Sequence, residues 1–157
     1  MEKTDKNYQI DNTDLKILKW LLQDATMPYT DIAEKVFVSP GTVHVRMKKL
    51  KEMGIVTGAQ ITLNYQKLGW DVAAFIGIYL DKSSLYEKVV AELEQIEEVV
   101  SLHYTTGAYS IFARIICRDT KHLREVLNEK IQKLKGIQRT ETFISLEERF
   151  TRPLPLI

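Results

Sequence analysis

Side chains suited to reading DNA bases lie together near the start of one basic segment, residues 39–54. A valine can contact the C5 methyl group of thymine, threonine and histidine can hydrogen-bond base edges, and lysines can reach phosphates. The stretch 39–53 holds four basic residues and one acidic residue, a local charge excess that suits a polyanion. The predicted DNA-contact residues are Ser39, Gly41, Thr42, His44, Val45, Arg46, Lys48 and Lys49.

One amphipathic helix is expected to position these residues. Ser39 can cap its N-terminus, Pro40 suits its first turn because an N–H there has no helical partner, and Gly54 can end it in the left-handed conformation. At about 100° per residue, one narrow side of the helix is apolar and faces a core: Val43, Met47 and Leu50. On charge alone, an ordinary surface helix with a solvated lysine side is the better interpretation, and the preceding segment is what favours DNA binding.

Two helical patterns precede this segment. Asp11 can cap the first, with Asp14 three residues on and Ile10 packing on Leu15. Thr30 can cap a short second helix whose inward residues are Ile32, Ala33 and Val36. Three helices within about 45 residues predict a tri-helical helix-turn-helix. The apolar residues that follow predict a short hairpin or wing: Ile55, Val56, Ile61 and Leu63.

Strand-like and helix-like patterns alternate in the remaining residues. The order is βαββαβ, the ferredoxin-like arrangement, so the whole chain is expected to be an α+β protein. We expect a winged helix-turn-helix domain over 1–64, a linker over 65–70, and a ferredoxin-like ligand-binding and oligomerisation domain over 71–157. The expected strands are 72–80, 99–105, 109–117 and 137–146, and the expected helices are 85–96 and 120–134.

The predicted sheet has apolar residues on both faces. The two helices of a ferredoxin-like domain cover one face, so the other face of a monomer is expected to alternate with polar residues. The first strand instead places Phe75 and Tyr79 opposite Ala74, Ile76 and Ile78. A second subunit is the natural cover, and we predict a dimer formed sheet to sheet.

A polar cluster surrounds the predicted turn between the second and third strands. Hydroxyls, an amide and backbone N–H groups can hold a small zwitterion such as an amino acid. A plain Thr-Gly hairpin and a threonine-rich edge strand are the alternative interpretation. The candidate effector-binding residues are Thr106, Gly107, Tyr109 and Ser110 of the turn, with Gln138, Thr140 and Thr142 of the last strand.

Three stretches carry a family resemblance. YTDIAEKVFVSPGTVHVRMKKLKEMGIVTGAQI resembles the helix-turn-helix and following strand of the Lrp/AsnC transcription regulators, and SPGTVHVR with GIVTGA is most similar to the asparagine-responsive type. YTTGAYSIFARI and IQRTETFISL resemble the turn and last strand of the family's effector-sensing (RAM/ACT-like) domain, where an amino acid binds between dimers. The resemblance implies a regulator whose operator binding or assembly responds to an amino acid, with dimers that form an octamer, a tetramer of dimers.

Two positions depart from the common family pattern. Many members have an aspartate at the position of Ser110 or of Ala108, and the asparagine-responsive sequences do not, which favours asparagine over leucine. Many members have glycine where this chain has Phe37, and a bulky residue with positive φ costs about 1–2 kcal/mol. We expect either a differently built turn or a Phe37 side chain packed into the core.

Composition and missing motifs exclude several classes of protein. The chain has 157 residues, 45% of them apolar, and a net charge of +1. Its single cysteine, Cys117, excludes an internal disulfide and a cysteine-rich zinc site, and no secretory signal or membrane-length apolar run is present. We expect a cytoplasmic protein. No phosphate loop, nucleophile motif or metal-ligand spacing of the three histidines occurs, so no enzyme, cofactor or metal is expected.

Two other binding functions remain as alternatives. An amino-acid-binding regulatory subunit of a metabolic enzyme predicts ligand binding without DNA affinity, which the basic helix argues against. An RNA-binding sheet requires exposed aromatic residues in an RNP1-like pattern. The turn Thr106-Gly107-Ala108-Tyr109 lacks both the basic residue and the aromatic spacing of that pattern.

Overall fold

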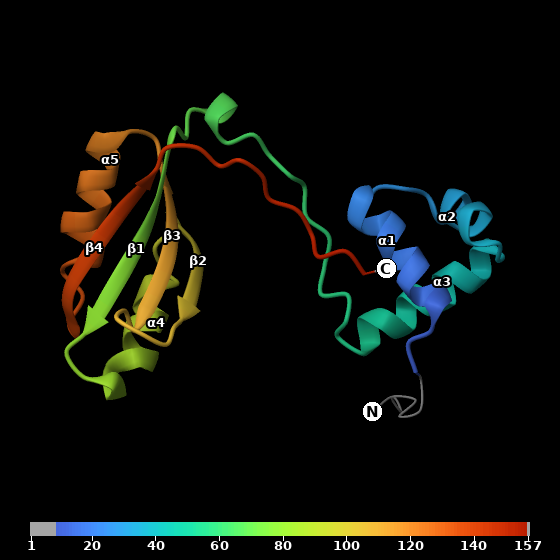
Figure 1. The fold of residues 1–157 in the computed structure, drawn as a ribbon, viewed down its shortest axis with the longest axis horizontal. Helices are drawn as coiled ribbons and strands as arrows, with labels where there is room; N and C mark the ends of the chain where they lie inside the picture. Colours follow the sequence, from blue (N-terminus) through green and yellow to red (C-terminus); the bar gives the residue numbers. More distant parts are fainter. Residues whose placement is uncertain (1–8, 157) are drawn as a thin grey trace. The chain divides into compact units, whose positions relative to one another are not determined.

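The computed structural model describes residues 9–156 of the chain, which form two compact units. The first unit contains residues 9–62 together with 150–156, and the second contains Leu63–Arg149 (Figure 1). Residues 1–8 and 157 of the predicted domains lie outside the described residues. No helix of the described chain is long and apolar enough to cross a membrane.

Three helices form the N-terminal unit: α1 (Asn12–Gln23), α2 (Tyr29–Val36) and α3 (Pro40–Glu52). The predicted cap of α1 is confirmed, because the N–H of Asp14 donates to Asp11 Oδ1 and the N–H of Asp11 donates to Asp14 Oδ2, both at 3.0 Å. Ser39 caps α3, Pro40 opens it, and Gly54 follows it with φ of 70°. The three helices enclose a core of Ile17, Ile32, Ala33, Val36, Val43, Met47 and Leu50, which contains all the predicted inward residues of α2 and α3.

Two local predictions for this unit are wrong. Thr30 does not cap α2, because the helix begins one residue earlier, after Pro28, and the Thr30 hydroxyl donates to Asp31 instead (3.0 Å). No strand lies between α3 and β1 (Val72–Leu80), so residues 55–63 form no hairpin, and Ile61 is 85% exposed. A strand requires a neighbour for its backbone N–H and C=O groups, and the described chain supplies none to this segment.

Phe37 keeps the left-handed conformation that a glycine adopts in such a turn. Its φ and ψ are 57° and 50°, and it is the only residue other than glycine with positive φ among the described residues. Its side chain is 94% exposed. Both expectations for Phe37 are therefore wrong, since the turn has the usual left-handed geometry and the ring does not enter the core.

The C-terminal unit has the predicted order of strands and helices. Its elements are β1 (Val72–Leu80), α4 (Tyr86–Leu93), β2 (Val99–Tyr104), β3 (Ile111–Cys117), α5 (Thr120–Glu125), which continues as the π-helix η3 (Val126–Ile131), and β4 (Ile137–Ser145). All paired strands are antiparallel, in the order β2-β3-β1-β4. Ile78 of β1 pairs with Ile111 of β3 and with Thr140 of β4, so the β2–β3 turn and the start of β4 lie at one end of the sheet.

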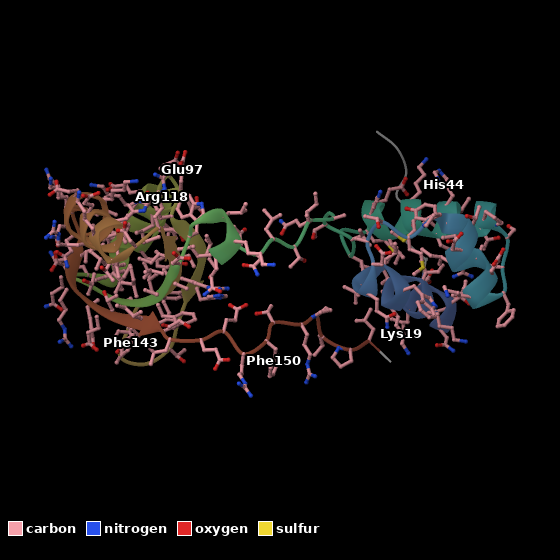
Figure 2. The ribbon with its side chains drawn as sticks, turned by 90° about the horizontal axis from the view of Figure 1, so that it is seen from above. Lys19, His44, Glu97, Arg118, Phe143 and Phe150 are labelled. Atoms are coloured by element: carbon pink, nitrogen blue, oxygen red, sulfur yellow. The ribbon has the colours of Figure 1, made fainter. Side chains whose placement is uncertain are left out.

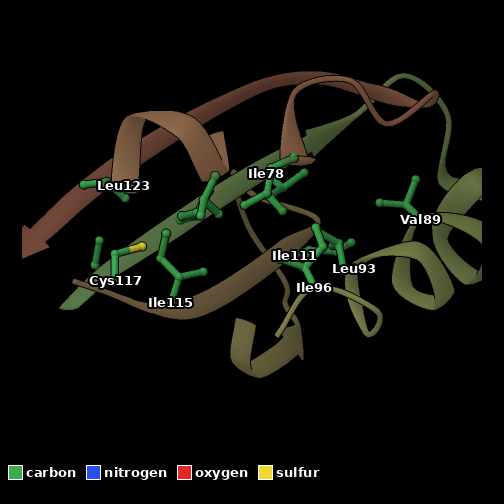
Figure 3. Packing of buried hydrophobic residues seen from close by; sticks show 12 residues of the cluster. Ile78, Val89, Leu93, Ile96, Ile111, Ile115, Cys117 and Leu123 are labelled. Atoms are coloured by element: carbon green, nitrogen blue, oxygen red, sulfur yellow. The ribbon is translucent and has the colours of Figure 1, made fainter. Parts of the chain in front are cut away.

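The two faces of this sheet have different surroundings. Sheet residues such as Ile78 and Ile115 pack against Val89 of α4 and Leu123 of α5 in a buried cluster (Figure 3). Cys117 belongs to this cluster, and burial raises its pKa to about 11. We call the other side, which carries Phe75, Tyr79, Phe112, Arg139, Glu141 and Phe143, the open face.

Candidate nucleic-acid interface and ligand site

The helix α3 has one buried side and one exposed side, as its sequence predicts. Val43, Met47 and Leu50 are at most 4% exposed, whereas Val45 is 54% exposed. His44 is exposed at the surface of the unit as well (Figure 2). An exposed valine next to an exposed histidine, on a helix whose far side is fixed in a core, presents a rigid apolar and hydrogen-bonding surface.

The N-terminus of α3 is organised by one hydroxyl pair. Ser39 Oγ accepts the backbone N–H of Thr42 at 3.1 Å and lies 2.9 Å from Thr42 Oγ1. Ser39 therefore acts first as the cap that fixes the start of the helix. When Ser39 donates to Thr42, the hydroxyl hydrogen of Thr42 can turn to an acceptor outside the protein. Gly41 beside them is exposed.

Tyr29 is a residue at this surface that the sequence analysis missed. It opens α2, and its ring meets the ring of His44 edge to face, with 6.1 Å between centroids and an interplanar angle of 60°. The contact orients His44 from one side. An aromatic residue at the start of a helix gives no such signal in the sequence, because the contact joins residues of two helices.

Arg46 is directed to α1. Its Nη1 donates to Asp11 Oδ2 at 2.8 Å and to Asp14 Oδ1 at 2.9 Å, and Asp14 is fully buried. The backbone N–H of Asp14, followed by the Arg46 guanidinium, lowers the pKa of Asp11. Arg46 thus joins the cap of α1 to α3. We therefore leave it out of the DNA contacts proposed below.

The lysines of α3 are differently placed. Lys48 Nζ lies 3.7 Å from Glu52, and both side chains are well exposed, so this pair is weak and leaves Lys48 accessible to a stronger anion. Lys49 is half-buried. The lysines of α3 thus lie in its C-terminal half, whereas the residues suited to base edges lie in its N-terminal half.

The β2–β3 turn is held by its backbone. The N–H of Thr105 donates to the carbonyl of Ser110 (3.1 Å), and the N–H of Ser110 donates to the carbonyl of Ile78 (3.0 Å). Gly107 has φ of 113°, a conformation that favours glycine, and no other group lies within 4 Å of where its Cβ would be. Thr106 and Gly107 are exposed at the tip of the turn and remain accessible to a ligand.

The predicted residues of β4 border a pocket of about 350 Å³, lined by Gln132, Ile137, Gln138, Arg139 and Thr140. The Nε2 of Gln132 lies 3.3 Å from Thr140 Oγ1. Gln132 follows η3 and was missed, since nothing in its sequence surroundings separates it from a surface glutamine. Thr142 is exposed and does not line this pocket.

The structure does not bring the seven predicted effector residues into one site within one chain. Thr106, Gly107 and Ser110 belong to the turn, and none of them lines the pocket at Gln138 and Thr140. The ring of Tyr109 points to the open face, where its hydroxyl donates to Glu141 Oε2 at 2.7 Å. The hydrogen bond to the Glu141 carboxylate raises the pKa of Tyr109 to about 12. Tyr109 is therefore engaged away from the pocket.

His122 of the C-terminal unit lies in a cluster of charged side chains. His122 Nε2 lies 3.0 Å from Glu98 Oε1, and Lys130 Nζ donates to the same carboxylate at 2.7 and 2.8 Å. Burial raises the pKa of Glu98, but the hydrogen bonds from Lys130 and His122 outweigh burial and leave that pKa below its ordinary value. Among residues 9–156, no group of three or more His, Cys, Asp or Glu can hold a metal ion.

Comparisons with known proteins match two successive parts of the chain to two families. Residues 10–57 match a family described as winged helix-turn-helix DNA-binding, and residues 73–155 match the Lrp/AsnC ligand binding domain. The regulatory protein AsnC of Escherichia coli K12 is 45% identical over 149 residues, which cover 95% of this chain and 98% of that protein. AsnC of Haemophilus influenzae is 44% identical over 147 residues, covering 94% and 98%.

Solved structures give the same result for the fold. The structure of E. coli AsnC superimposes with a TM-score of 0.89 at 44% identity, covering 94% of this chain and 99% of that one. The L-Met complex of a Neisseria meningitidis transcriptional regulator also has a TM-score of 0.89, at 24% identity, covering 94% and 97%. The latter likeness shows the fold alone.

Proposed function

Because the chain belongs to the Lrp/AsnC family of DNA-binding transcriptional regulators, we propose that a small amino acid, with asparagine favoured, binds its C-terminal domain and controls operator binding. The helix-turn-helix and its match over residues 10–57 remove the alternative of a regulatory enzyme subunit without DNA binding. The function is therefore regulation of transcription, and no catalytic step is involved. We also propose a cytoplasmic location, since such a regulator works where the chromosome lies.

We propose that α3 enters the major groove with Val45 contacting a thymine methyl group and Lys48 contacting a phosphate. The observation that supports this most strongly is the 54% exposed Val45 on a helix whose opposite side is buried. Gly41, Thr42, His44 and Lys49 complete the proposed contact set, with Ser39 fixing the start of the helix and Tyr29 orienting His44.

The two kinds of contact can be separated by measuring operator affinity against salt. Val45→Ala removes two methyl groups from the apolar contact and is expected to reduce preference for a thymine by about 1 kcal/mol, with the salt slope unchanged. Lys48→Ala is expected to weaken binding to all sequences alike and to reduce the salt slope by about 1. If Val45→Ala and wild type discriminate equally at every operator position, α3 does not read bases through Val45.

We propose that the effector site is completed between subunits, from the turn of one chain and the β4 pocket of another. This follows from the separation of Gly107 and Ser110 from the pocket at Gln138 and Thr140 within one chain. The side-chain amides of Gln132 and Gln138 and the Thr140 hydroxyl can hydrogen-bond a carboxamide. The E. coli relative is named AsnC, and the Neisseria structure is an L-Met complex.

Calorimetry of the full-length protein with each of the twenty amino acids tests the effector. We expect asparagine to bind most tightly. Ser110→Leu is expected to abolish the response to the effector while operator binding persists, because Ser110 lies in the C-terminal unit and not on α3. Heat from another amino acid alone would reassign the effector, and no heat from any of the twenty would remove the ligand-binding proposal.

We propose that two chains pair through their open faces and that the dimers assemble further into an octamer. Phe75 and Phe112 stack at 5.7 Å on this face, and Phe143 beside them is 46% exposed. A contiguous aromatic surface on a sheet is the kind of surface that a second copy covers. Sedimentation velocity at micromolar concentration tests the proposal, and a monomer there contradicts it.

A further inference from the structure

Tyr109 belongs to two regions of the C-terminal unit at once. Its backbone is part of the β2–β3 turn, where its carbonyl accepts the Thr105 hydroxyl at 2.7 Å. Its side chain leaves the turn and lies on the open face, over Gly77 of β1 and against Glu141 of β4. There its ring contacts three aromatic residues of that face, Tyr79, Phe112 and Phe143, at 5.1, 5.9 and 6.3 Å between ring centroids.

The ring of Tyr109 lies on the open face in the space above Gly77, where the sheet has no side chain. We call this space the notch. Gly77 lies between Phe112 and Glu141 in the cross-strand register. A Cβ at Gly77 would lie 2.4 Å from the Tyr109 ring, far inside van der Waals contact. The missing side chain at this one position therefore makes room for Tyr109, and it fixes where the ring lies.

The hydroxyl of Tyr109 is anchored at the far side of the notch. Glu141 accepts from Tyr109 at 2.7 Å and from Tyr79 at 3.1 Å. Arg139 lies 3.4 Å from Glu141 and 3.8 Å from the centre of the Tyr79 ring. The carboxylate thus holds residues from the turn and from β1 in one network on the open face.

We propose that Tyr109 is a positioning residue that couples the effector turn to the face on which the second copy docks. A ligand that moves the turn backbone moves the Tyr109 ring in its notch, and this alters the surface presented to the partner. The inference rests on the proposed effector site and dimer, and it adds the residue through which one influences the other. It predicts that ligand binding and dimerisation become independent when the anchor is lost.

A matched pair of variants at Glu141 tests the coupling. Glu141→Ala removes the acceptor of the Tyr109 hydroxyl, whereas Glu141→Gln keeps an acceptor oxygen there. Glu141 alternates along β4 with Thr140 and Thr142, so its side chain lies on the opposite face of the sheet from theirs, and Glu141 does not line the pocket. Tyr86→Phe is the control, since it removes a hydroxyl from a tyrosine of α4 whose ring packs on Tyr104 outside this network.

The measurement is the dimer dissociation constant of the full-length protein, by sedimentation over a dilution series, with and without saturating asparagine. In wild type and Tyr86→Phe we expect asparagine to change this constant by about tenfold or more, within the range of allosteric couplings. In Glu141→Ala we expect a change below about threefold, with asparagine still bound in calorimetry. Glu141→Gln is expected to retain most of the wild-type change.

Each other outcome has a defined meaning. If wild type binds asparagine but its dimer constant does not change, or if Glu141→Ala keeps the full change, the coupling role of Tyr109 is wrong. If Glu141→Ala loses asparagine binding while still folded by circular dichroism, Glu141 or Tyr109 acts on the ligand and not on the coupling. If wild type itself binds no amino acid, the proposed function fails first, independently of Tyr109.

A second variant tests the position of the Tyr109 ring directly. Gly77→Ala places a methyl group where the Tyr109 ring lies, so it is expected to displace the ring without altering Glu141 or the turn sequence. Its asparagine-dependent change in dimer dissociation is expected to fall as in Glu141→Ala. A wild-type change in a folded Gly77→Ala protein would contradict the proposal.

Discussion

The two units of this chain complete their structures in different ways. The N-terminal unit closes its core within one chain, caps α1 and α3 with its own side chains, and uses Arg46 to tie the two helices together. The C-terminal unit closes its core on one side of the sheet and leaves aromatic rings such as Phe112 on the other. The first unit therefore completes its core within one chain, whereas we propose that a second copy covers the open face of the second unit.

The difference follows from how each unit encodes its contacts. The caps of α1 and α3 are local, since each joins residues three positions apart in the chain. The contacts on the open face join β1, β3 and β4, which are distant in sequence. In the proposed function, this arrangement lets an effector act on assembly without disturbing α3.

The largest effect is expected from placing a charge on the open face. Phe112→Asp removes an apolar ring and adds a carboxylate that a partner would bury, so dimer dissociation should rise about a thousandfold, or about 4 kcal/mol. Phe37→Asp is the matched control, because Phe37 is 94% exposed in the other unit. Sedimentation that shows equal dimer constants for the two variants would remove the distinction between the units.

The next largest effect is expected within the N-terminal unit. Arg46→Ala leaves the buried Asp14 without its guanidinium partner, and the unit should lose about 3 kcal/mol of unfolding free energy. Urea unfolding followed by Trp20 fluorescence, in a Trp70→Phe background, reports this unit alone. Lys48→Ala breaks only an exposed pair and should cost less than about 1 kcal/mol. Equal losses for both variants would show that the Arg46 cluster has no special role.

Acid is expected to weaken both units through carboxylates with lowered pKa. The pKa of Asp11 is lowered first by the Asp14 N–H and then by Arg46, and the pKa of Glu141 is lowered by the Tyr109 and Tyr79 hydroxyls. A carboxyl with a lowered folded-state pKa stabilises the fold above its ordinary pKa and loses that contribution as pH falls through the folded value.

The Asp11→Asn variant tests whether the acid sensitivity of the two units has separate causes. Asparagine keeps a capping oxygen but does not titrate, so unfolding of the N-terminal unit should depend less on pH between about pH 5 and pH 3. The transition of the C-terminal unit should keep its wild-type pH dependence. The measurement is the fluorescence of Trp20 for the N-terminal unit and of Trp70 for the C-terminal unit, each observed with the other tryptophan replaced. An unchanged acid sensitivity of the N-terminal unit would show that Asp11 is not the group responsible.

The smallest effect is expected at the helix-turn-helix turn. Phe37→Gly removes about 1–2 kcal/mol of left-handed strain but costs about 0.5–1 kcal/mol through the greater entropy of the unfolded chain, so a net stabilisation of at most about 1.5 kcal/mol is expected. Phe37→Ala keeps the Cβ and should give no such gain. Thermal unfolding of the Trp70→Phe background measures the difference. A destabilised Phe37→Gly protein would mean that the exposed ring has a contact that supports the unit.

The sequence by itself determined most of the local structure. Ser39, Pro40 and Gly54 set the bounds of α3, and the continuous apolar run over 72–80 set the bounds of β1. The sequence patterns failed at two places. Thr30 does not cap α2 because the helix begins directly after Pro28, and residues 55–63 form no hairpin because no partner strand lies beside them. Such patterns are readable because caps and periodicity act over a few residues.

Only the tertiary structure decided which candidate side chains face which surface. Arg46 and Lys48 are both basic residues of one helix, yet the first is held by α1 and the second by an exposed glutamate. Tyr109 follows the turn glycine by two residues, yet its ring lies in the notch over Gly77. The physical reason is the same in both cases, since a long side chain takes its direction from partners that the fold brings near and that the sequence keeps far apart.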